Sequence, residues 1–129
     1  MKRRVMFVDD EPNVLHALKA LLRPLRHEWE MVFVEGGEEA LAAMASAGFD
    51  VVVSDMRMPQ MDGAELLKRV SELSPRTGRL VLSGYADEAS MARAAQVAHR
   101  CLDKPCELEL LREAIDTVLK ARECAPATR

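Results

Sequence analysis

Short apolar runs alternate with longer segments of helical periodicity along almost the whole chain. The short runs are continuous, which is typical of parallel strands buried on both faces. They cover residues 4–8, 29–34, 51–53, 80–82 and 100–103. The run 100–103 is the weakest, and it is included mainly because the alternation requires a fifth strand.

The segments between these runs carry apolar residues three and four positions apart, as the buried face of a helix requires. These helices are expected to begin at or near residues 12, 37, 64, 88 and 107. Pro12 suits a first helical position, and Gly48 and Pro75 mark helix ends. Five strands alternating with five helices predict an α/β fold, a parallel sheet with helices on both faces. The pattern does not determine the strand order.

The chain has 129 residues, 49% of them apolar, which is enough for the core of one domain. We expect that domain to cover residues 1–121. Residues 122–129 contain Pro126 and no periodicity, so they are expected to be a tail or the start of a linker.

Charge and cysteine content narrow the function classes. The net charge of -3 argues against direct nucleic-acid binding by this segment. No apolar stretch is long enough to span a membrane. Lys2, Arg3 and Arg4 are better interpreted as a solvated strand entry than as a signal peptide. Three cysteines without a framework spacing favour a reducing compartment, so a cytoplasmic location is expected. His99, Cys101 and Cys106 fit no zinc-ligand spacing.

The residues with the clearest chemistry stand at the ends of the expected strands. They are Asp9 and Asp10 after the first strand, Asp55 after the third, Ser83 after the fourth and Lys104 after the fifth. In open α/β sheets, ligands bind at the edge formed by the carboxyl ends of the strands. Three carboxylates, a hydroxyl and an ammonium are therefore expected at one edge.

Carboxylates gathered in this way repel one another unless cations offset them. Lys104 supplies one cation, and a set of oxygen ligands favours Mg²⁺ over zinc. Such a site suits phosphoryl transfer, in which the protein mainly positions groups and neutralises charge. Asp55 stands singly after the central strand, so it is the candidate nucleophile that would form an acyl phosphate. Asp9 and Asp10 are adjacent and better placed to hold the metal.

Four motifs together resemble the receiver domains of two-component response regulators, the CheY-like superfamily. They are Val8-Asp9-Asp10-Glu11-Pro12, the segment Ser54-Asp55-Met56-Arg57-Met58-Pro59-Gln60-Met61-Asp62-Gly63, Leu82-Ser83-Gly84 and Lys104-Pro105. Each motif alone is weak, whereas all four in order at strand ends are specific. The resemblance extends from about residue 3 to residue 121.

The resemblance implies a single flavodoxin-like (βα)5 domain whose strand order is 2-1-3-4-5, the order given for this fold. It implies that Asp55 accepts a phosphoryl group and that Ser83 and Lys104 bind it. Mg²⁺ would be ligated by Asp10, Asp55 and the backbone carbonyl of Arg57, and Asp9 would act indirectly. Pro105 is expected to follow a cis peptide bond. Asp62, in contrast, is expected to cap a helix before Gly63.

The implied donor is a sensor histidine kinase or a phosphotransfer protein. The phosphorylated domain is expected to switch a surface that binds a second copy, an attached output domain or a separate protein. The domain would act as a signalling phospho-acceptor rather than as an enzyme on other substrates. Three stretches look like receivers fused to HDOD or HD-GYP output domains: residues 54–63, residues 82–87 and Ala98-His99 with Lys104-Pro105-Cys106.

Two features depart from the family pattern. Cys101 stands where many receivers carry an aromatic switch residue, which puts the switch mechanism in doubt more than phosphorylation itself. Arg57 and Tyr85 lie two residues beyond Asp55 and Ser83, where the family lines the path of the hydrolytic water. We therefore hypothesise that their bulky side chains alter the phosphoryl lifetime.

Other functions remain as alternatives. A degenerate receiver could act as a phosphorylation-independent dimerisation or binding module, although the complete set of site residues argues against it. A phosphatase with an aspartyl nucleophile usually carries Asp-x-Asp after its first strand, and this chain has Asp9-Asp10 instead. No Gly-x4-Gly-Lys-Ser/Thr loop for a nucleotide is present. Asp9 and Asp10 could also simply favour the dipole of the first helix.

Overall fold

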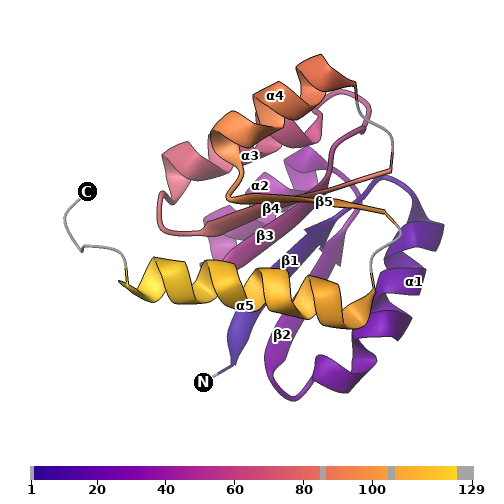
Figure 1. The fold of residues 1–129 in the computed structure, drawn as a ribbon, viewed down its shortest axis with the longest axis vertical. Coiled ribbons are helices and arrows are strands. Elements are labelled where there is room, and N and C mark those ends of the chain that lie inside the picture. The colour runs from indigo at the N-terminus through magenta and orange to yellow at the C-terminus, as the bar shows by residue number, and fades with distance from the viewer. Residues whose placement is uncertain (1, 85–86, 105–106, 125–129) are drawn as a thin grey trace.

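The structure is a computed structural model that describes residues 2–84, 87–104 and 107–124. Within these residues five parallel strands form one sheet in the order β2-β1-β3-β4-β5 (Figure 1). The strands are β1 (Arg3–Val8), β2 (Trp29–Val34), β3 (Val51–Asp55), β4 (Gly78–Ser83) and β5 (Arg100–Asp103). The expected α/β class and the strand order implied by the family resemblance are both confirmed.

Five helices connect the strands. They are α1 (Pro12–Leu22), α2 (Gly37–Ser46), α3 (Gly63–Leu73), α4 (Glu88–Val97) and α5 (Leu108–Cys124), and the short 3-10 helix η1 (Arg23–Leu25) follows α1. No helix of the described residues is both long and apolar enough to cross a bilayer.

The sheet separates two hydrophobic cores, because successive side chains of a strand point to opposite faces. On one face α1 and α5 cover the sheet through Leu15, Leu22, Leu111, Ala114 and Ile115. On the other face α2, α3 and α4 cover it through Ala40, Leu66, Leu67, Val70 and Ala94. Figure 1 shows α5 and α1 on one side of the strands and α2 and α3 behind them. The inner strands β1, β3 and β4 are buried between helices, which explains their apolar runs, whereas the edge strands β2 and β5 are only partly buried.

The structure moves several element boundaries by a few residues. β4 begins at Gly78, two residues before the expected run, because Gly78 pairs with Val51 of β3. A β-carbon on Gly78 would collide with Val118 of α5, so the helix lies directly against this strand end. The last helix continues to Cys124, three residues beyond the expected end of the domain at residue 121.

Candidate functional site

The strand register brings the predicted residues to one edge. β1 and β3 pair with Val8 opposite Ser54, so Asp9 and Asp55 follow at adjacent strand ends. β4 pairs with β3 and with β5, and Ser83 lies opposite Asp103, the residue before Lys104. All the side chains therefore leave the carboxyl end of the same parallel sheet, as the edge rule predicts.

Three carboxylates form a tight cluster at this edge. Asp9, Asp10 and Asp55 each offer an oxygen, and these oxygens lie within 4.8 Å of one another. Asp9 is only 2% exposed, and the Asp55 side chain is 11% exposed. Negative charges this close and this poorly hydrated repel one another strongly. The cluster therefore favours a cation.

Lys104 supplies part of that compensation. Its Nζ lies 2.7 Å from Oδ2 of Asp9 and 3.1 Å from Oδ1 of Asp55. The backbone N–H of Lys104 donates to the carbonyl of Ser83 at 2.9 Å, which fixes the base of the side chain beside β4. Partial burial works to lower the pKa of Lys104, but its hydrogen bonds to Asp9 and Asp55 outweigh burial and raise the pKa. The ammonium form is therefore stabilised here.

The pKa of Asp55 is shifted in the opposite direction from that of an ordinary ion-paired carboxylate. Burial is the largest influence and raises the pKa of Asp55; the hydrogen bond from Lys104 lowers it, and the charge of Asp9 raises it again. The net effect is a raised pKa. A single lysine thus leaves the carboxylate of Asp55 under-compensated, and a further cation near it would favour its ionised form.

The other ligand positions fit a magnesium ion. The donor set contains oxygens alone, which is the set that Mg²⁺ prefers. Asp9 already accepts from Lys104 through Oδ2 and from the backbone N–H of Glu11 through Oδ1 at 2.9 Å. Asp10 is less buried than Asp9, so it has more freedom to ligate directly.

The backbone around Asp55 is held by neighbours that the strand-end pattern does not single out. Ser54 Oγ donates to the carbonyl of Asp55 at 2.8 Å. Gly63 N–H donates to the carbonyl of Met56 at 2.8 Å. A β-carbon on Gly63 would collide with the carbonyl oxygen of Asp55 and lie 3.0 Å from Cα of Met56. Only glycine lets α3 begin this close to the candidate phospho-acceptor.

Asp62 is the helix cap that the sequence predicts, since its Oδ1 accepts from the backbone N–H of Glu65 at 2.9 Å. Cys101 is partly buried against the core on the α2–α4 face, and burial raises the pKa of its thiol. His99 has a packing role, because its Nδ1 accepts from the backbone N–H of Arg79 at 3.0 Å. Pro105 with its expected cis bond, Tyr85 and Cys106 lie outside the described residues.

Comparison with known proteins identifies a single family. The sequence model for the response regulator receiver domain matches residues 5–116. The transcriptional regulatory protein GlrR of Escherichia coli (strain K12) is 31% identical over 125 residues, which cover 96% of this chain and 27% of that protein. The chain thus spans about a quarter of the length of this curated relative.

Solved structures agree in fold. The signal receiver domain of an HD domain-containing protein from Pseudomonas fluorescens Pf-5 superposes with a TM-score of 0.90 at 31% identity, covering 97% of this chain and all of that one. The Vibrio cholerae chemotaxis protein CheY4 gives a TM-score of 0.81 at 30% identity, covering 92% and 99%.

Proposed function

This chain belongs to the response regulator receiver domain family, and from that membership we propose that Asp55 is its phosphoryl acceptor. Receiver domains of two-component systems are signalling phospho-acceptors that are phosphorylated on an aspartate. The observation that carries the assignment to Asp55 is its contact with Lys104, which also binds Asp9 in the acidic cluster. Asp9 shares the lysine and the cluster, but its Oδ1 accepts from the backbone N–H of Glu11 and it is only 2% exposed. Asp55 is the more accessible of the two, because its side chain is 11% exposed.

The chemistry is a direct displacement at phosphorus. An oxygen of the Asp55 carboxylate forms a bond to phosphorus while the bond from phosphorus to the donor's imidazole nitrogen breaks, and the nitrogen keeps the electron pair and takes a proton. Lys104 and the hydroxyl of Ser83 bind phosphoryl oxygens in the product. Asp10, Asp55 and the backbone carbonyl of Arg57 would hold Mg²⁺, with Asp9 acting indirectly, and the ion would supply the charge neutralisation that phosphoryl transfer requires.

The functional consequence is a switch. Binding of the phosphoryl group by Ser83 draws the end of β4 toward Asp55, and the surface formed by α4, β5 and α5 changes with it. Coupling between two such sites is commonly about 1–3 kcal/mol. The degenerate receiver remains the competing function, and Cys101, in place of an aromatic switch residue, is the observation that favours it.

The phosphoryl donor, the downstream target and the cellular location can be proposed on the same basis. The donor is a sensor histidine kinase or a phosphotransfer protein, and the target is a second copy, an attached output domain or a separate protein. The similarity to a receiver from an HD domain-containing protein supports an output of the HDOD or HD-GYP kind. The domain promotes only its own phosphorylation and dephosphorylation. We place it in the cytoplasm, where ATP charges histidine kinases and thiols such as Cys101 stay reduced.

Intact mass after incubation with acetyl phosphate and Mg²⁺ tests the assignment. The wild-type protein should gain one phosphoryl group, about 80 Da by formula mass for an acyl phosphate. Asp55→Asn should abolish the gain, and omission of Mg²⁺ should suppress it. Asp103→Asn removes an exposed carboxylate at the same edge and should leave the gain intact. A gain that persists in Asp55→Asn would refute the assignment, and no gain by a folded wild-type protein would favour the degenerate module.

A further inference from the structure

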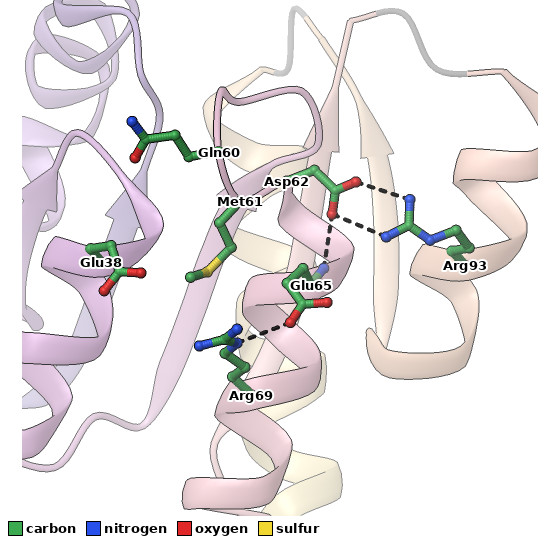
Figure 2. Close-up of a pocket in the computed structure, with 7 residues that line it drawn as sticks. All are labelled: Glu38, Gln60, Met61, Asp62, Glu65, Arg69 and Arg93. Carbon is green, nitrogen blue, oxygen red and sulfur yellow. Dashed lines mark hydrogen bonds and ion pairs between the residues drawn. The ribbon is translucent and has the colours of Figure 1, made fainter.

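Two exposed ion pairs lie close together beside the candidate site, and they differ in what they connect (Figure 2). Arg69 binds Glu65 at 2.9 Å, and both residues belong to α3. Arg93 belongs to α4, and its two terminal nitrogens lie 2.9 Å from Oδ2 and 3.3 Å from Oδ1 of Asp62. Of these two pairs, only Arg93–Asp62 joins α4 to the connection that leads from Asp55 at the end of β3 to the start of α3.

Asp62 is linked to Asp55 by a short path of backbone contacts. Its Oδ1 caps α3 at Glu65, which fixes the side chain. The next residue, Gly63, donates to the carbonyl of Met56 and touches the carbonyl of Asp55. Arg93 and Asp62 therefore connect α4 to the backbone of the candidate phospho-acceptor.

Few apolar contacts compete with this ion pair in positioning α4. Ala94 is the one fully buried residue of that helix, and Met91 and Val97 are partly buried. Helices held by few buried apolar side chains open and shift at low free-energy cost. Even a modest bidentate contact at the middle of α4 can therefore influence where the helix lies.

The ion pair accompanies the resting form of the site. Lys104 Nζ contacts the free carboxylate oxygens of Asp9 and Asp55, which is its arrangement beside an unmodified aspartate. If the phosphoryl group draws Ser83 and the end of β4 inward, the N-terminal part of α4 must follow. The contact to Asp62 opposes that movement, because Asp62 stays capped onto α3.

We propose that the Asp62–Arg93 ion pair is a latch that holds α4 in its resting position and so opposes activation. This inference rests on the proposed phospho-switch and deepens it, since it assigns to Arg93 and Asp62 a positioning role in regulation of that site. Breaking the latch should favour the activated arrangement and, by linkage, strengthen binding of any group that stabilises it.

The test uses beryllofluoride with Mg²⁺ as a probe of phosphoryl binding on Asp55. Asp62→Asn keeps the helix cap, since asparagine caps as well as aspartate, but loses the charge that holds Arg93. Arg93→Gln removes the other partner. Because exposed ion pairs are weak, each variant should bind beryllofluoride about 1.5- to 5-fold more tightly than wild type. The double variant should bind no more tightly than the singles, because both break the same contact.

The two variants change the net charge in opposite directions, which separates the latch from long-range electrostatics. Asp62→Asn removes a negative charge and Arg93→Gln a positive one, so a simple charge effect on an anionic probe would shift affinity in opposite senses. Arg69→Gln is the matched control, because its side chain is 50% exposed against 53% for Arg93, and its ion pair stays within one helix. Its affinity should equal that of wild type.

Hydrogen exchange of residues 88–97 in the unmodified protein gives a second readout. It should be faster in Asp62→Asn and Arg93→Gln and unchanged in Arg69→Gln. Equal affinities in wild type and both variants, opposite shifts, or the same shift in the control would each overturn the latch while leaving the phospho-acceptor assignment in place. A wild-type protein that takes up no beryllofluoride with Mg²⁺ would overturn the proposed function and the latch together.

Discussion

At the scale of single residues, Asp55 combines two conditions that oppose each other. Phosphoryl transfer needs its carboxylate, whereas burial and the neighbouring Asp9 raise its pKa and favour the neutral acid. Lys104 offsets only part of this effect. The ionised carboxylate therefore destabilises the fold, because a raised carboxyl pKa costs stability once the group ionises.

Asp55→Asn should therefore stabilise the protein at neutral pH without Mg²⁺. Because the folded state raises the pKa of Asp55, the contribution of this residue to stability is most favourable below the ordinary carboxyl pKa. That contribution is lost as the pH rises through the folded-state pKa. The gain at pH 7 should be about 1–2 kcal/mol, an ordinary size for relief of a poorly compensated charge. It should shrink near pH 4 and on addition of Mg²⁺, as measured by urea unfolding.

Asp103→Asn is the control, since Asp103 is exposed at the same edge and should show no such gain. If Asp55→Asn were less stable than wild type at pH 7 without Mg²⁺, the ionised carboxylate would be well compensated by Lys104. The account of the site's electrostatics would then be wrong.

At the scale of elements, the junction between β3 and α3 determines where Asp55 points. The strand ends at Asp55, and α3 begins at Gly63 in contact with its carbonyl. The intervening loop includes Gln60 with a left-handed φ of 69°, while the backbone N–H of Met61 donates to the carbonyl of Pro59 at 2.7 Å. A tight turn thus brings the helix back onto the strand end.

Gly63→Ala should disrupt this junction. The added methyl group would collide with the carbonyl of Asp55, so α3 must shift, at a cost of about 1–3 kcal/mol for overpacking. The rate of phosphorylation by acetyl phosphate should fall as well, because the strand end moves with the helix. Gly48→Ala is the matched control, since a β-carbon on Gly48 meets no atom within 4 Å.

Chemical denaturation and phosphorylation kinetics of the two alanine variants check this prediction together. Equal stability and equal rates for Gly63→Ala and wild type would show that the close approach of α3 is not required.

At the scale of the whole molecule, the core on the α1 and α5 face of the sheet ends within α5. Among the residues whose side chains the structure describes, the last buried ones are Val118 and Leu119, at 4% and 5% exposure. The sequence pattern places the domain end at residue 121, beyond both of them. The predicted boundary at residue 121 therefore matches the end of the described buried side chains. It does not match the end of the helix, because α5 continues to Cys124.

A chain ending at residue 121 should unfold with a free energy within about 1 kcal/mol of the full chain, since it retains every described buried side chain. A chain ending at residue 117 lacks Val118 and Leu119 and should lose several kcal/mol, about 2–5 for each large buried side chain removed. Thermal and urea unfolding distinguish the two. A large loss at residue 121 would mean that residues 122–129 belong to the folded domain.

The sequence predicts features that depend on the order of the strands, but not those that depend on contacts between distant residues. The predicted site residues each follow a short apolar run: Asp9, Asp10, Asp55, Ser83 and Lys104. Because parallel strands end at the same edge of a sheet, the positions of these residues along the chain are enough to predict that they lie at one edge. The start of β4 at Gly78 cannot be predicted in this way, because glycine and Arg79 are poor strand formers and the pairing with β3 decides. The Asp62–Arg93 contact joins exposed residues 31 positions apart, and no periodicity relates them.

The bond between Lys104 and Asp9 spans 95 positions of the chain. A ribosome makes Asp9, Asp10 and Asp55 long before it makes Lys104, which binds two of them. Until β5 emerges and takes its place beside β4, a nascent chain displays the acidic residues without their cationic partner. With the proposed function, we therefore expect competence to receive a phosphoryl group to arise only late in synthesis, once β5 is in place.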